Sequence, residues 1–361
     1  MKPSSSIVPL AVAVLLSCGG SPKPTSPPPP PSAAAPVATA PPAASTRPSQ
    51  ASSVLARDAA IAEVKRLTAV ADQDPFLAAW EGPNGGVPPW DKLKVDAFPK
   101  AFEVGLALQL AEVNAIAEDP EPPTFENLFV PLENAGRHEA RAETLFGVMT
   151  GNLSTPEIQA VDKQWSPRIA AARDKITFND KLFARITVVY AGRERLEPEN
   201  RRLVELRYER FIKAGAKLSP TDKAKVGAIN EELAGLFTEF NKKVLADENT
   251  WIELGPADLG GLSPSLRASY AAAAAERKLD GKWAVVNTRS SVDPFLEASP
   301  RRDLREQVWK AFKRRGDNGG ENDTHATIAR IVKLRADRAR LLGYASHAEW
   351  RMSDTMARDP Q

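Results

Sequence analysis

Apolar residues beyond residue 54 recur at three- and four-residue steps through most of the chain, which is the spacing of amphipathic helices. The clearest helix is predicted to begin at Ser219-Pro220-Thr221-Asp222, because serine caps a helix N-terminus and proline fits its first turn. One apolar stripe follows, formed by Val226, Ile229, Leu233, Leu236, Phe237, Phe240 and Val244. The pattern therefore predicts a long helix with a single apolar face.

Other helix boundaries follow from similar signals. Thr155-Pro156-Glu157 and Ser299-Pro300 are typical of helix starts, and a helix predicted from about Thr324 stops at Gly343, a good C-terminal cap. Residues 251–296 look mixed, since Trp283-Ala284-Val285-Val286 is typical of a short strand between helices. The predicted fold class is mainly α: an extended multi-helix array with a short mixed segment.

The N-terminus has the pattern of an export signal. Lys2 precedes an apolar run from Ile7 to Leu16, which is too short to span a membrane as a helix, and Ser17-Cys18-Gly19-Gly20 follows. Leu15-Leu16-Ser17-Cys18 resembles the lipobox of bacterial lipoproteins, in which the cysteine is diacylated. We therefore expect residues 1–18 to be a lipoprotein signal peptide and Cys18 to be the lipidation site that anchors the chain to a membrane.

By the same resemblance, Gly19 after the cysteine favours the outer membrane of a two-membrane bacterium. The expected location is thus the bacterial cell envelope, at the outer membrane or in the periplasm. An ordinary cleaved signal that contains a chance cysteine is the alternative.

Residues 19–53 are rich in Pro, Ser and Ala and include the five-proline run Pro27–Pro31. This segment has almost no large apolar side chains, so burial cannot offset the entropy of ordering it. It is predicted to be a disordered linker, and residues 54–361 are predicted to form the folded body.

Composition and charge narrow the classes of function. The chain has 361 residues, of which 42% are hydrophobic, enough for a substantial core. Its 48 Lys and Arg residues nearly balance 46 Asp and Glu residues, so no nucleic-acid partner is expected. Cys18 is the only cysteine, which excludes a disulfide within the chain and a zinc site built from cysteines.

Several segments occur in the order that they have in a known family: Asp74–Leu77, Val87–Leu93, Phe98–Glu103, Pro123–Asn127, Leu132–Gly136, Arg210–Leu218, Ile229–Leu233, Leu279–Trp283 and Leu341–Trp350. They resemble the N-terminal part of the thimet oligopeptidase and peptidyl-dipeptidase family of zinc metallopeptidases, and are closest to its bacterial peptidyl-dipeptidases. The similarity runs from about Asp74 to the last residue. The physical roles of these segments are helix packing, turns and caps, so they indicate ancestry and fold rather than chemistry.

The resemblance implies a two-lobed helical peptidase that cleaves short peptides with zinc as cofactor. The family binds the metal through two histidines four residues apart on one helix and uses the glutamate after the first as the base. That motif is expected beyond residue 361. We therefore predict that the chain is truncated before the catalytic domain, as a truncated product or a partial sequence, that it contains no catalytic residue, and that it binds no zinc itself.

The three histidines of the chain do not supply the motif. His138-Glu139 begins like it, but Ala142 stands where the second histidine is required. His325 and His347 have no second histidine at helical spacing. Each histidine is interpreted as a surface or packing residue rather than as a metal ligand.

Two functions remain open from the sequence. In the first, the chain is part of a peptidyl-dipeptidase and is inactive alone. In the second, it is a non-catalytic envelope lipoprotein that serves as a peptide-binding or scaffold module. Apolar surface left uncovered by a missing half would favour the first, but sequence alone does not show which face apolar stretches such as Leu182–Tyr190 occupy.

Overall fold

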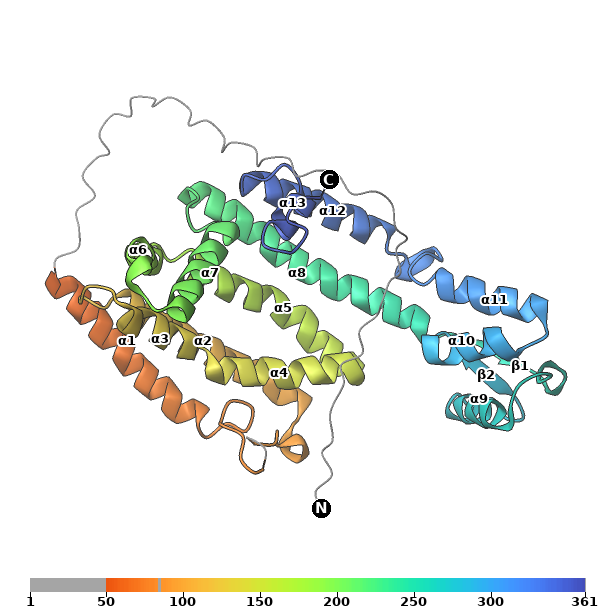
Figure 1. Ribbon diagram of the computed structural model, residues 1–361. Helices are drawn as coiled ribbons and strands as arrows, with labels where there is room; N and C mark the ends of the chain where they lie inside the picture. Colours follow the sequence, from red (N-terminus) through yellow and green to blue (C-terminus); the bar gives the residue numbers. More distant parts are fainter. Residues whose placement is uncertain (1–49, 84–85, 361) are drawn as a thin grey trace, which may run out of the picture. The chain divides into compact units, whose positions relative to one another are not determined.

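The computed structural model describes residues 50–83 and 86–360 (Figure 1). Cys18, the predicted signal peptide and residues 19–49 of the predicted linker lie outside the described residues. The first helix, α1 (Gln50–Ala71), begins within the last four residues of that linker. The predicted boundary at residue 54 is therefore slightly too late, because Gln-Ala-Ser-Ser is compatible with a helix that apolar residues farther along stabilise.

The mainly α fold class is confirmed. The remaining helices are α2 (Phe98–Ala117), α3 (Val130–Asn134), α4 (Arg137–Asn152), α5 (Pro156–Thr177), α6 (Asp180–Ala191), α7 (Pro198–Ala214), α8 (Pro220–Glu248), α9 (Pro264–Glu276), α10 (Arg289–Ala298), α11 (Arg302–Lys313), α12 (His325–Leu341) and α13 (His347–Met352). Strands β1 (Trp251–Leu254) and β2 (Trp283–Val286) form an antiparallel pair in which Trp251 lies opposite Val286. The mixed segment predicted for residues 251–296 is thereby confirmed.

Most of the predicted helix starts are found. The Ser219 side chain accepts a hydrogen bond from the backbone N–H of Asp222 at 3.2 Å, and the Thr155 side chain caps α5 in the same manner. The Ser299-Pro300 start is misplaced, since α11 begins at Arg302. The Ser299 hydroxyl instead accepts the backbone N–H of Arg301 at 3.3 Å, which closes a turn before the helix.

The first hydrophobic core lies between α1, α2, α4 and α5, where an aromatic cluster is formed by Phe76, Phe98, Phe102, Phe146 and Trp165. Phe98 and Phe102 are fully buried, and the ring of Phe102 lies 5.3 Å from that of Phe146 and 5.5 Å from that of Trp165. Edge-to-face packing of this kind adds to the free energy gained by burial. This core fixes α2 against its three neighbours.

A second core joins α2 to α6, α7 and the short helical turn Phe125–Phe129. Thr124 and Asn127 cap that turn reciprocally, so part of the Pro123–Asn127 segment acts as a helix start. Within Leu182–Tyr190, Leu182 and Ile186 are fully buried, whereas Val188 remains 57% exposed. This apolar stretch therefore faces the core on one side only.

A third core surrounds the two strands and α9, α10 and α11, with Tyr270 and Phe295 at its centre. Helix α8 packs against α5 and, through Leu233, against Ile331 and Leu334 of α12. Its predicted stripe is not covered along its whole length, because Phe237 is 36% exposed. No helix in the described part of the chain is long and apolar enough to cross a membrane.

We predict that Phe102→Ala lowers the free energy of unfolding by about 3–5 kcal/mol, because it removes a fully buried ring from a close-packed core. Urea unfolding followed by circular dichroism measures the change. The control is Leu55→Ala, which truncates a side chain of α1 that is 70% exposed and should leave stability within about 0.5 kcal/mol. Equal losses in both variants would contradict the placement of this core.

Candidate functional site

The three histidines lie in three different helices. His138 belongs to α4, while His325 and His347 are the first residues of α12 and α13. Within residues 50–83 and 86–360, the group of side chains whose donor atoms lie close enough to hold a metal ion is Asp317, Asp323 and His325. This group contains a single imidazole, so the structure brings no two histidines together as metal ligands there.

His138 and Glu139 both contribute to the packing of α4 against neighbouring segments. The His138 Nε2 atom lies 3.0 Å from the carboxylate of Asp72, next to the end of α1. Ala142 is fully buried, which leaves no room for a histidine at that position. The backbones of α2 and α4 also approach closely here, since a Cβ atom added to Gly105 would lie 3.1 Å from the Cα atom of Glu139.

Glu139 is a buried acid that the sequence analysis considered only as part of the His138-Glu139 pair. Its side chain hydrogen-bonds Glu143 one turn later on α4, and Arg173 of α5 donates to both carboxylate oxygens of Glu143. The Oε1 atom of Glu139 is buried without a hydrogen-bond partner among the described residues. Burial and, secondarily, the charge of Glu143 raise the pKa of Glu139 well above its usual range.

A sequence signal for this acid exists. Glu139 is flanked at helical spacing by Ala142 and Phe146, both of which are buried in the first core. An acid on the apolar face of a predicted helix indicates either a buried partner or a perturbed pKa.

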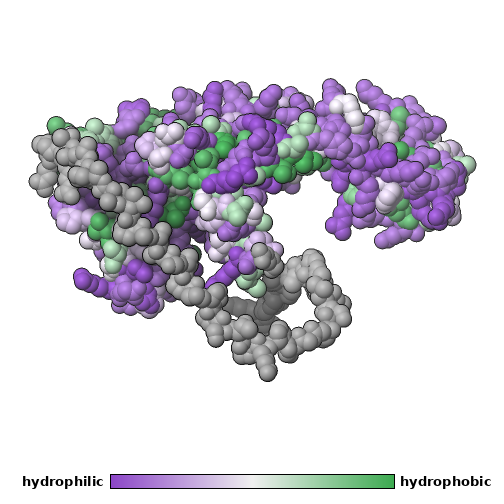
Figure 2. Space-filling view, turned by 90° about the horizontal axis from the view of Figure 1, so that it is seen from above, coloured by the Kyte–Doolittle hydropathy of each residue, from purple (hydrophilic) through white to green (hydrophobic). Residues whose placement is uncertain are grey.

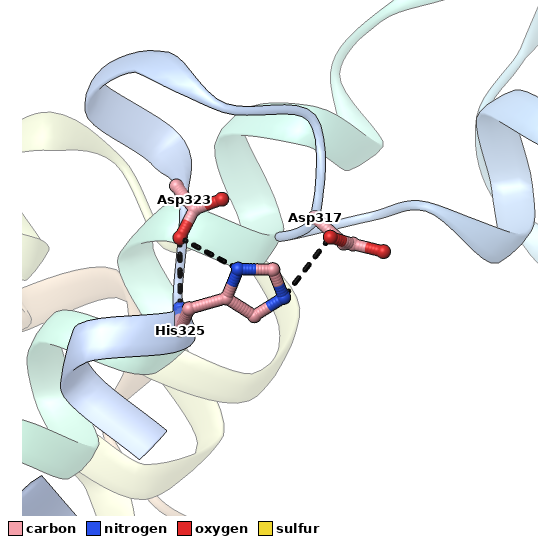
Figure 3. A group of neighbouring side chains, drawn as sticks. All are labelled: Asp317, Asp323 and His325. Carbon is pink, nitrogen blue, oxygen red and sulfur yellow. Dashed lines mark hydrogen bonds and ion pairs between the residues drawn. The ribbon is translucent and has the colours of Figure 1, made fainter. Parts of the chain in front are cut away.

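The group of Asp317, Asp323 and His325 lies where the loop after α11 meets α12 (Figure 3). The His325 Nε2 atom lies 3.0 Å from Asp317 and the Nδ1 atom 3.4 Å from Asp323. Asp323 also accepts the backbone N–H of His325 at 2.9 Å, which closes a turn at the start of α12. The imidazole side chain is 69% exposed, so the two carboxylates hold it at the surface in an arrangement of ion pairs.

A buried carboxylate anchors the same loop to the end of α8. Asp247 is 6% exposed and accepts the backbone N–H of Gly316 at 2.7 Å and the side-chain amide of Asn318 at 2.9 Å. Asn287, which follows β2, donates to the backbone carbonyl of Asp247 at 3.1 Å. Asp247 therefore connects α8 to both the loop and the strand pair.

The donor set does not match the zinc site that the family resemblance implies. That site requires two imidazoles one helical turn apart and a glutamate base, whereas this group offers one imidazole whose two nitrogens already face carboxylates. We therefore derive no hydrolytic step from these residues. That the chain holds no zinc and no catalytic residue stays a prediction.

A groove of about 750 Å³ lies between the C-terminal half of α4, α5 and α8. Its lining combines charged side chains with apolar ones, including Glu143, Asp162, Arg173, Phe237, Phe240 and Leu245. The volume falls in the range of sites that hold small ligands or a few amino-acid residues. The pair formed by Arg173 and Glu143 stands at the wall of this groove, next to buried Glu139.

A second cavity of about 700 Å³ lies between α7 and the segment that follows α13. Its basic lining residues outnumber its acidic ones: Arg202, Arg210, Lys213, Lys217 and Arg358 face Glu209 and Asp354. The sequence analysis did not consider these cations as a group, because the fold is needed to bring Arg358 beside those of α7.

Comparisons with known proteins agree with the resemblance. Residues 295–361 match the model of peptidase family M3. The dipeptidyl carboxypeptidase of Escherichia coli (strain K12) is 36% identical over 278 residues, which are 76% of this chain and 41% of that protein. The protein of the same name from Salmonella typhimurium is 34% identical over the same shares of the two chains, and a probable cytosolic oligopeptidase A of Arabidopsis thaliana is 24% identical over 76% of this chain and 40% of that protein.

These matches confirm the relationship predicted from the sequence. The chain spans about two fifths of the length of the curated relatives that it matches. Similarity over that share concerns the helical part described above.

Because Glu139 is a buried acid, we predict that Glu139→Gln raises the free energy of unfolding by an amount that depends on pH. The raised pKa means that the folded state keeps its proton at pH values where the unfolded state has lost it, so the wild type loses stability as pH rises above about 4.5. The glutamine variant should therefore unfold with a free energy about 1–2 kcal/mol higher than the wild type near pH 8, and the difference should vanish near pH 4.

Urea unfolding over this pH range measures the effect. Ala140→Gln, at the next and exposed position of α4, introduces the same amide without removing a titratable group; it is the control and should give no pH-dependent difference. A gain in the Glu139 variant that stays constant with pH would show that the Glu139 carboxyl group is not the origin.

Proposed function

We propose, because this chain is homologous to the peptidases of family M3, that it forms the helical part of a zinc peptidyl-dipeptidase acting on short peptides. The observation that carries the proposal is the 36% identity to a dipeptidyl carboxypeptidase over 76% of the chain. In this proposal the chain supplies the wall that encloses the substrate. Zinc and the attacking water belong to a catalytic part that the residues of this chain do not provide.

The surface of the chain supports this division of roles. Ile328 and Val332 are 42% and 59% exposed, and they lie one turn apart on the same face of α12. Figure 2 shows hydrophobic residues gathered in the middle of a face that is otherwise largely hydrophilic. A module that works alone would carry polar side chains at such positions, whereas a lobe that packs against another keeps them apolar.

The groove beside α8 is the site that we propose for part of the peptide. Its length along α5 and α8 and its mixture of charged and aromatic side chains suit an extended chain of varied sequence. The ion pair between Arg173 and Glu143 keeps one wall of the groove rigid. Less conformational entropy is therefore lost when a peptide binds.

A chimera tests the proposal. Residues 50–361 are fused to the part of the Escherichia coli dipeptidyl carboxypeptidase that this chain does not match, and dipeptide release from short peptides is measured with and without zinc. We expect zinc-dependent release at least about 100-fold above that of the catalytic part alone, because the helical part positions the substrate. The 361-residue chain alone should contain no stoichiometric zinc and release no dipeptide.

Two results would contradict the proposal. One is a folded, zinc-loaded chimera without activity. The other is dipeptide release by the 361-residue chain itself. A chain that stays monomeric and soluble during size exclusion, binds peptides and leaves the chimera inactive would favour the non-catalytic scaffold instead.

We also propose that the protein is anchored in the cell envelope through lipid on Cys18, on the strength of Leu15-Leu16-Ser17-Cys18. Replacement of Cys18 by serine should move the protein from the membrane fraction to the soluble fraction, because a serine is not acylated. Immunoblots of the two fractions measure the change. The control Ser17→Ala should leave the protein in the membrane fraction. If the Cys18 variant also stays in the membrane fraction, the anchor through Cys18 is contradicted.

A further inference from the structure

Trp350 of α13 is surrounded by cations from three segments. The Nζ atom of Lys213 lies 5.7 Å from the centre of the indole ring, and the guanidinium carbons of Arg338 and Arg351 lie 4.6 Å and 5.9 Å from it. The ring of His347 is 5.4 Å away. We call these five residues the Trp350 cluster.

The cluster is fixed in position by the fold. The indole N–H of Trp350 donates to the backbone carbonyl of Lys213 at 2.9 Å and thereby ties α13 to α7. Arg338 donates to the side-chain oxygen of Asn230 at 2.7 Å, which ties α12 to α8. The positions of the aromatic ring and of one guanidinium group are therefore set before any ligand arrives.

Carboxylates offset only part of this positive charge. Lys213 is paired with Asp354, and Arg338 reaches Asp174 only through Asn230, whose amide donates to both carboxylate oxygens at 3.0 Å. Within the part of the chain that the structure describes, Arg351 forms no ion pair with a carboxylate.

Arg335 adds a further cation on the preceding turn of α12. Its guanidinium carbon lies 5.0 Å from the ring of Phe237, and it also has no carboxylate partner among residues 50–83 and 86–360. Burial and the charges of Arg335, Arg338 and Arg351 lower the pKa of His347. The region thus concentrates positive charge.

Two polar atoms of the cluster have no hydrogen-bond partner among the described residues. They are Nε of Arg338 and Nδ1 of His347, and both atoms are buried. A buried polar nitrogen without a partner costs about 1–3 kcal/mol, so a ligand that accepts or donates a hydrogen bond there would be favoured. The Nε–H of Arg338 requires an acceptor, which is the same ligand chemistry that the excess charge favours.

We propose that the Trp350 cluster, together with Arg335, is a binding site for an oxyanion, either a carboxylate or a phosphate group. Guanidinium groups bind carboxylates and phosphates through paired N–H donors. Cation–π contacts with the indole ring hold the cations in place when no oxyanion is bound. The basic cavity between α7 and the segment after α13 shares Lys213 with the cluster, so the positive charge of the region extends into it. This inference does not depend on the proposed peptidase function.

Calorimetric titration of the full chain tests the site with three probes. They are inorganic phosphate, acetylated trialanine with a free C-terminal carboxylate, and the C-terminal amide of the same peptide. We expect the phosphate or the free acid to bind and the amide not to bind. The probe that binds more tightly, inorganic phosphate or the free acid, shows whether the site takes a phosphate group or a peptide carboxylate.

The variant Arg335→Gln/Arg351→Gln should weaken binding at least about 10-fold, since it removes two of the charges while sparing the half-buried Arg338. The control is Arg340→Gln, which alters an arginine of the same helix that is exposed and paired with Asp337. It should leave the affinity unchanged. Circular dichroism of both variants checks that the helices are intact.

The imidazole resonances of His347, assigned with His347→Gln, supply a second readout and should shift on titration. Three results would overturn the proposal: no binding of phosphate or free acid up to about 10 mM, equal binding of acid and amide, or an unchanged affinity in the double variant. Because binding rather than hydrolysis is measured, an inactive chimera would not be confused with any of them.

Discussion

The side chain of Asn230 joins three helices through one amide group. It donates to the carboxylate of Asp174 on α5 and accepts from the guanidinium of Arg338 on α12, while its own helix, α8, runs between them. A charge pair placed in contact at this depth would require desolvation of both ions. The amide separates the charges and forms hydrogen bonds with both, so α8 can be packed on two sides. The groove lies between two of the helices that this amide joins, α5 and α8, and Arg338 of the Trp350 cluster lies on the third.

Homology and local chemistry carry different information here. The segments shared with the peptidases form caps, turns and buried faces, as the Thr124 and Asn127 pair shows. Their order along the chain indicates the family, while the roles that the structure shows for them are structural. The side chains with shifted pKa values, such as Glu139 and His347, lie within helices that the family segments help to position. Function must therefore be argued from such sites rather than from the fold.

Much of the fold could be predicted because its signals are local. The N-cap at Ser219 and the end of α12 before Gly343 each depend on a few neighbouring residues. Features that depend on distant segments could not be predicted. The Ser299 hydroxyl was equally compatible with a cap and with a turn, and the burial of Glu139 required the close approach of α2. The group around His325 includes Asp317, which lies in a loop that Asp247, far away in sequence, holds through Gly316 and Asn318.

The third hydrophobic core has a different character from the other two. Its members all lie between Ile252 and Phe312, and the two strands that it surrounds are separated by one helix. Closing a short loop costs little entropy, so contacts of this kind form quickly. During synthesis on the ribosome, this region can therefore reach its native packing as soon as it emerges, without waiting for the segments that follow. It would then offer a preformed surface on which α12 assembles.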